Sequence, residues 1–142
     1  MDPQAHRKLD QIMAQIASET GATVHAYPRP GRAVRRVILR DIRDGGGTRL
    51  ETAQIEDDGT LRISGHDTGS RVTEFFGTAI TSYEWVYVIA PARVDTLLRL
   101  LGGAEGADVL DALATYHQQH GGQLSELMRS PEIAAYFDNW HS

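Results

Sequence analysis

The chain has 142 residues, of which 41% are hydrophobic, and this length and composition predict one globular domain spanning residues 1–142. It contains no cysteine, which excludes disulfides, thiol nucleophiles and zinc–thiolate sites and fits a reducing cytoplasm. The net charge of -5 disfavours nucleic-acid binding, and no apolar run approaches the roughly 18 residues that a membrane span requires. We therefore expect a cytoplasmic protein without a membrane or nucleic-acid partner.

The first 27 residues predict a helix followed by a short strand. Asp2 supplies an N-cap and Pro3 stands at the first helical position, which is a common way for a helix to begin. Apolar residues then recur at intervals of three and four, as on one face of a helix, at Leu9, Ile12, Met13 and Ile16. We expect a helix over residues 3–20, ended by Gly21, and a strand over residues 22–27.

Three further strands are predicted over residues 33–43, 49–56 and 60–65. Their centres are aliphatic and partly β-branched, and the last strand alternates, so that Leu61 and Ile63 are expected to face inward. The connecting segments, DGGGT and DDG, are short and rich in glycine, which is typical of hairpin turns. Together these segments predict an antiparallel meander.

Residues 29–43 form a basic stretch, with six arginines and one acidic residue. The arginines could bind phosphate or an acidic partner surface. They could instead pair across the predicted hairpin with Glu51 and neighbouring acidic residues. We favour cross-strand pairing and keep the first alternative open.

His66 and Asp67 stand side by side between Gly65 and Gly69. One hypothesis is a catalytic or metal-binding pair, in which the imidazole acts as base or ligand and the carboxylate orients it. The other is a turn, in which the glycines permit the backbone geometry and Asp67 caps a short helix over residues 70–77. We favour the turn, because adjacent residues that leave a strand point in different directions.

The clearest strand pattern is SYEWVYVIA at residues 82–90, with one face made by Tyr83, Trp85, Tyr87 and Ile89. Helices are predicted over residues 92–103, 108–122 and 130–142, with a turn or short helix over residues 123–128. Asp108 and Ser130 are expected to be N-caps. The buried stripe of the last helix is expected to be Ile133, Tyr136, Phe137 and Trp140.

The order of these segments, a helix, then strands, then mostly helices, indicates the α+β class rather than alternating βα units. We expect an N-terminal helix, a four- to five-stranded antiparallel meander sheet, and C-terminal helices that cover one face of the sheet.

His117 and His120 lie three residues apart on a predicted helix, a spacing that also occurs in metal sites. No glutamate lies between them and no third ligand has a fitting spacing. We expect His117 on the apolar face and His120 at the helix C-terminus, where a histidine is favourable. The sequence also lacks phosphate- and dinucleotide-binding glycine motifs, so we expect no metal, no cofactor and no catalytic residues.

Acidic residues gather near the predicted turns of the sheet. They could form a patch that binds a basic protein, because complementary charge speeds association and selects partners. They could also be a solvated surface that keeps the protein soluble. Tyr83 is a candidate anchor at such a patch, whereas Trp85 and Tyr87 are expected in the core. The candidate partner-binding residues are Glu56, Asp57, Asp58, His66, Asp67, Glu74, Tyr83 and Glu84.

The segment from Asp58 to Leu113 resembles a group of small, uncharacterised bacterial proteins. The shared pattern is a strand, a G-[HQ]-D-x-G turn, a short helix and a strand that begins with Tyr-Glu, matched by Gly65, His66, Asp67, Gly69, Phe76, Gly77, Tyr83 and Glu84. Some members of this group look like immunity proteins of polymorphic toxin systems. The resemblance implies a non-enzymatic module that neutralises a cognate toxin domain by occupying its active site or substrate surface.

Two other functions remain open from the sequence. The protein could be an enzyme or a small-ligand-binding protein in which His66, Asp67 and Glu84 converge in a concave pocket at one end of the sheet. It could also be a homodimer that pairs through an exposed strand edge.

Overall fold

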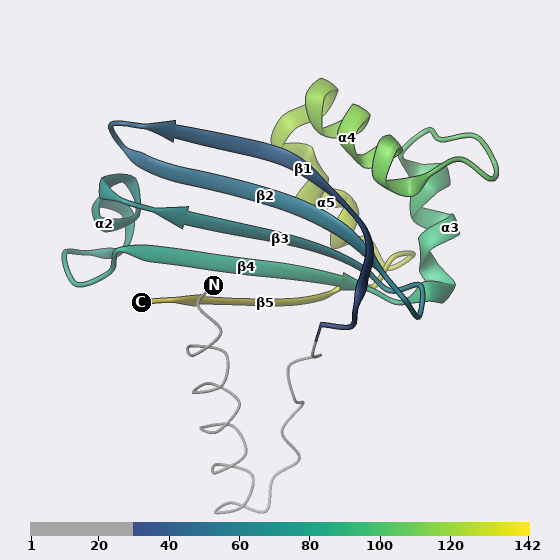
Figure 1. Cartoon of the computed structure of the whole chain (residues 1–142), viewed down its shortest axis with the longest axis horizontal. Helices are drawn as coiled ribbons and strands as arrows, with labels where there is room; N and C mark the ends of the chain where they lie inside the picture. The colour runs from purple at the N-terminus through teal and green to yellow at the C-terminus, as the bar shows by residue number, and fades with distance from the viewer. Residues whose placement is uncertain (1–29) are drawn as a thin grey trace, which may run out of the picture.

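The computed structural model describes residues 30–142, which contain one five-stranded antiparallel sheet in the order β1-β2-β3-β4-β5. The expected α+β class and antiparallel sheet are confirmed (Figure 1). The helix expected over residues 3–20 and the strand expected over residues 22–27 lie outside the described residues. The strands are β1 (Ala33–Asp44), β2 (Gly47–Glu56), β3 (Leu61–Thr68), β4 (Ser82–Ile89) and β5 (Tyr136–His141).

Helices lie at both ends of the sheet. Figure 1 shows α2 (Ser70–Phe76) at one end, between β3 and β4, and the other helices gathered at the opposite end. These other helices are α3 (Pro91–Leu100), α4 (Val109–His120), the single 3₁₀ turn η1 (Gly121–Gln123) and α5 (Leu124–Met128). Asp108 is the N-cap of α4, as expected, because its carboxylate accepts hydrogen bonds from two backbone N–H groups of the first turn.

The hydrophobic core lies between one face of the sheet and these helices. Strand residues alternate between the two faces, so every second residue of β2, β3 and β4 lies on the face that carries the helices. The core members are Ala53, Leu61, Ile63, Tyr87 and Ile89 from the sheet, and Leu97, Leu98, Val109, Leu110, Leu113, Leu124, Met128 and Ile133 from the segments that follow it. The inward orientation expected for Leu61 and Ile63 is confirmed.

The turn expected at His66 and Asp67 is wrong, because β3 continues through both residues to Thr68. Gly65 is needed inside this strand for packing, since a Cβ there would overlap the indole of Trp85, its cross-strand neighbour. The N-cap of α2 is Gly69, with a φ of 101°, and no side chain caps that helix. Asp67 is therefore a strand residue rather than a helix cap.

The helix expected over residues 130–142 is also wrong. After α5 the chain turns and forms β5, whose residues from Tyr136 to His141 pair with β4. The physical reason is the open edge of β4, whose backbone groups gain hydrogen-bond partners from a strand and not from a helix. Ser130 consequently does not cap a helix, and the aromatic residues divide between the two faces of the sheet.

Replacing Gly65 with alanine is expected to lower the free energy of unfolding by about 1–3 kcal/mol, because the new Cβ overlaps the Trp85 indole. Urea unfolding measures this loss. Gly45→Ala is the matched control, since a Cβ at Gly45 meets nothing within 4 Å. We expect the control to stay within about 0.5 kcal/mol of the wild type. Equal losses in the two variants would contradict the packing role of Gly65.

Candidate functional site

The helix-facing side of the sheet is hollowed where the core ends. One cavity of about 380 Å³, called here the α5-end cavity, lies between the sheet, α4, η1 and α5. A second cavity of about 320 Å³, the α2-end cavity, lies beside α2. Both cavities are lined by Arg49, Asp67 and Tyr83, so they form neighbouring parts of one concave surface.

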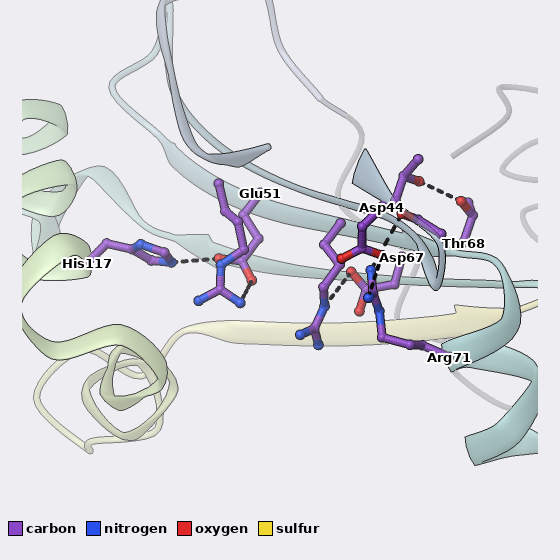
Figure 2. A network of polar contacts seen from close by, with 10 residues as sticks. Asp44, Glu51, Asp67, Thr68, Arg71 and His117 are labelled. Atoms are coloured by element: carbon purple, nitrogen blue, oxygen red, sulfur yellow. Dashed lines mark hydrogen bonds and ion pairs between the residues drawn. The ribbon is translucent and has the colours of Figure 1, made fainter. Parts of the chain in front are cut away.

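His117 reaches from α4 to the sheet and bonds to Glu51, with 2.7 Å between Nε2 and Oε2 (Figure 2). His117 is only 9% exposed, and the Glu51 side chain is also largely covered. Arg40 approaches the other oxygen of Glu51 at 3.9 Å, which is a looser contact. This chain of polar groups forms one wall of the α5-end cavity and fixes the helix on the sheet.

The rest of the α5-end cavity combines an aromatic surface with two further arginines. Trp85 and Tyr87 meet edge to face at 5.6 Å between ring centroids, and Phe137 of β5 lies 4.8 Å from Tyr87. Arg49 pairs with Asp67 at 3.7 Å. The exposed Arg129 makes no side-chain hydrogen bond or ion pair with any residue in the described part of the chain.

At the α2 end, three aromatic side chains and an arginine held in an ion pair line the second cavity. Phe76 packs against Tyr83 at 5.0 Å between ring centroids. Arg71 of α2 binds Asp44 at the end of β1 at 2.8 Å, as the close-up in Figure 2 shows. The Gly46 backbone N–H and the Arg71 guanidinium hold the pKa of Asp44 below its usual value. Phe75 projects from the same helix with 81% of its surface exposed.

The structure separates the three residues of the catalytic hypothesis. His66 and Glu84 meet on the sheet face opposite the helices, with 3.3 Å between Nε2 and Oε1. Trp140 donates to the other oxygen of Glu84 at 2.9 Å. Asp67, which follows His66 in the same strand, points to the helix-facing side and pairs with Arg49. The expected convergence of all three residues in one pocket is therefore wrong, because neighbouring strand residues face opposite ways.

His66 and Glu84 line a third cavity, of about 220 Å³, together with Arg36, Trp140 and neighbouring strand residues. Glu84 is only 5% exposed. Burial lowers the pKa of His66 below its ordinary value, although the adjacent Asp67 charge acts in the opposite direction. A pair of this kind can hold a proton between an imidazole and a carboxylate.

The residues of the candidate acidic patch do not form one surface. Glu56 is 3% exposed and makes a buried ion pair with Arg62, with 3.0 Å between Oε2 and Nε. Asp57 and Asp58 lie exposed in the turn between β2 and β3, whereas Glu74 lies on α2 at the far end of β3. The length of β3 separates the two groups, and Glu84 is buried on the face opposite Asp67. As a set, these residues lie at opposite ends and on opposite faces of the sheet.

The basic stretch is paired only in part. Arg40 reaches Glu51 across the hairpin as expected, but Arg35 binds Asp108 and Asp111 at the start of α4. Arg43 contacts Asp41 of its own strand at 3.4 Å. The cross-strand interpretation therefore holds for Arg40. The acidic partners of Arg35 lie at the start of α4 and not on the opposite strand of the hairpin.

The two candidate metal-binding histidines have different surroundings. His117 is engaged by Glu51, while the exposed His120 packs on Tyr116 with 4.5 Å between ring centroids. Within residues 30–142, no three histidine, cysteine or acidic side chains are arranged to hold a metal ion. In the same range, no helix has the length and apolar character needed to cross a membrane.

Sequence reasoning missed Arg49, His117 and Arg129 as residues that share one cavity. The sequence indicates Glu51 only as a residue opposite the arginines of the hairpin. Nothing in the linear pattern indicates that η1 and α5 turn back over the sheet, so the grouping depends on contacts between distant segments. No family model, no curated protein and no solved structure matches this chain. The class that the fold defines is an α+β protein with a hollowed five-stranded sheet.

The Glu51–His117 contact is expected to contribute a coupling energy of about 1–3 kcal/mol to folding, because it is a largely buried, charge-assisted hydrogen bond. A double-mutant cycle of Glu51→Ala and His117→Ala, measured by urea unfolding, gives this value. The control cycle of Asp41→Ala and Arg43→Ala removes an exposed ion pair and is expected to give about 0.5 kcal/mol or less. Similar coupling in the two cycles would contradict the assigned role.

Stability is expected to fall as the pH drops below the ordinary histidine value of 6.5, because His66 binds a proton less readily when folded. With its folded pKa lowered, the unfolded chain binds more protons in this window, so stability rises with pH. His66→Gln should reduce the change in the free energy of unfolding with pH, measured by urea unfolding at about pH 7.5 and about pH 5.5. His120→Gln, at an exposed site, is the control. A wild-type slope in His66→Gln would contradict the prediction.

Proposed function

We propose that the protein is a non-enzymatic protein-binding module of the immunity type, which binds and neutralises a cognate bacterial toxin domain. The observation that carries the proposal is Phe75, a residue that is 81% exposed beside the α2-end cavity. Single apolar residues scattered on a surface need no explanation. An exposed phenylalanine next to an aromatic hollow, however, has the arrangement of an interface anchor and its surrounding pocket.

The chemistry of the α2-end cavity supports a protein partner. It places the rings of Phe75, Phe76 and Tyr83 beside Arg49 and Arg71. Aromatic residues and arginine are enriched at the centres of protein interfaces.

The ion pairs of this cavity favour binding in a second way. Arg71 is held by Asp44, and Arg49 is held by Asp67. Side chains that are ordered before binding lose less conformational entropy when a partner arrives. The α2 end of the sheet therefore presents a surface whose polar groups are already in position.

Three of the eight candidate partner-binding residues belong to this end of the molecule. Tyr83 and Asp67 line the α2-end cavity, and Glu74 is exposed on α2. The proposed contact therefore keeps the predicted role for these three. It replaces the extended acidic patch with a smaller surface that carries charges of both signs around an aromatic centre.

Phe75→Asp is expected to weaken the complex with the cognate toxin domain by at least about tenfold, because it places a charge where an aromatic anchor enters the partner. Calorimetry with purified proteins and rescue of growth on co-expression measure the effect. Val34→Asp is the matched control, since Val34 is 69% exposed at the start of β1, far from α2.

Two results would count against the proposal. If the toxin domain and the wild-type protein formed no complex at about micromolar concentration, the immunity-type function would be wrong. If Phe75→Asp and Val34→Asp weakened the complex equally, the function would stand but the surface would be misplaced.

A further inference from the structure

The α5-end cavity has the features of a small-molecule site that the proposed protein contact does not use. Its volume of about 380 Å³ lies within the range of ligand pockets, which runs from about 300 to about 1,000 Å³. Phe75, the proposed protein anchor, is not among its lining residues. The inference drawn from this cavity therefore goes beyond the proposed function and does not depend on it.

One side of the cavity is an aromatic wall suited to a planar ring. Trp85 and Tyr87 are alternate residues of β4, Phe137 is the partner of Tyr87 on β5, and the three rings contact each other in series. Leu124 of α5 adds an apolar side chain to the same cavity. Phe137 is 44% exposed, so part of this wall is open to an incoming ring. Aromatic pairs favour offset or edge-to-face contacts, which such a wall can offer to a ligand.

The polar side of the cavity favours negative charge. Three arginines, at positions 40, 49 and 129, line it together with two carboxylates, those of Glu51 and Asp67. Both carboxylates are already engaged, Glu51 by His117 and Asp67 by Arg49. Arg129 alone among these arginines has no partner within the described residues. Its planar guanidinium can bind a carboxylate or a phosphate through two parallel hydrogen bonds.

From these features we infer that the α5-end cavity binds a small ligand that joins a planar aromatic ring to one anionic group. The ring lies on the wall formed by Trp85, Tyr87 and Phe137, and the anion is held by Arg129. The anion is a carboxylate or a phosphate, because the guanidinium recognises both by the same geometry.

Titration of ¹⁵N-labelled full-length protein with benzoate and with phenyl phosphate tests the inference and distinguishes the two anions. Benzamide, acetate and inorganic phosphate supply the ring or the charge alone. Trp85 lines both this cavity and the cavity beside His66, whereas Trp140 lines only the latter, so a shift of the Trp85 indole N–H signal without a shift of the Trp140 signal assigns binding to the α5-end cavity. At least one ring anion is expected to shift the Trp85 signal and to bind more tightly than benzamide and the free anions.

Arg129→Gln is expected to weaken binding of the ring anion about tenfold and to leave benzamide unchanged, because it removes one charge-assisted contact. Arg99→Gln is the matched control, since Arg99 is an exposed arginine of α3 outside the cavity. Phe137→Ala is expected to weaken benzoate and benzamide alike, because it removes part of the wall for both. Phe75→Asp is expected to leave all of these affinities unchanged, so failure here is distinguishable from failure of the proposed protein contact.

Several outcomes would overturn the inference. One is that neither ring anion shifts the Trp85 signal at about 10 mM, a concentration that reveals even fragment-strength binding. Another is that benzamide binds as tightly as the ring anions. Equal affinities in Arg129→Gln and Arg99→Gln would also exclude the site, and so would a shift of the Trp140 signal, with or without one of Trp85.

Discussion

The hydrogen bond between His117 and Glu51 joins the helical layer to the sheet, and the concave surface depends on it. The two residues are 66 positions apart in sequence and 2.7 Å apart in space. Apolar contacts hold α3 and α4 over one end of the sheet, but such contacts are non-directional. The polar contact has a fixed geometry, so it sets where α4 ends over β2 and where the uncovered part of the sheet begins.

The sequence predicted the participants of this contact better than the contact itself. The helical pattern placed His117 on the buried side of α4, and its low exposure agrees with that prediction. Glu51 was assigned to the arginines opposite it, yet Arg40 stays at 3.9 Å while His117 approaches closely. Local spacing shows which face a residue occupies, whereas the choice among distant partners is made by the packing of helix on sheet. The sequence likewise does not predict that Arg129 lines the α5-end cavity, because that position depends on how α5 packs on the sheet.

Most elements followed from residue patterns, and both errors arise from contacts between strands that local patterns do not show. The last segment places Tyr136, Asp138 and Trp140 at strand intervals and Ile133, Tyr136 and Trp140 at near-helical intervals. The unpaired edge of β4 decides between these patterns, and that edge exists only in three dimensions. At His66 and Asp67, the flanking glycines suggested a turn. Gly65 is instead a strand residue whose lack of a side chain leaves room for the indole of Trp85 on the neighbouring strand. If the strand predicted over residues 60–65 is extended by two residues, strand alternation places His66 and Asp67 on opposite faces of the sheet.

The net charge of the chain is a poor guide to the charge of its concave face. The protein carries -5 overall, but its two cavities are lined by Arg40, Arg49, Arg71 and Arg129 against two carboxylates. A ligand responds to the field within about a Debye length, roughly 8–10 Å at moderate salt, so the local arginines outweigh distant acidic residues. The Arg49–Asp67 ion pair lines both cavities, and a substitution there would disturb the two together. Phe75 lines only the α2-end cavity and Arg129 lines only the α5-end cavity, so substitutions at these two positions separate a protein contact at the α2 end from an anion site at the α5 end.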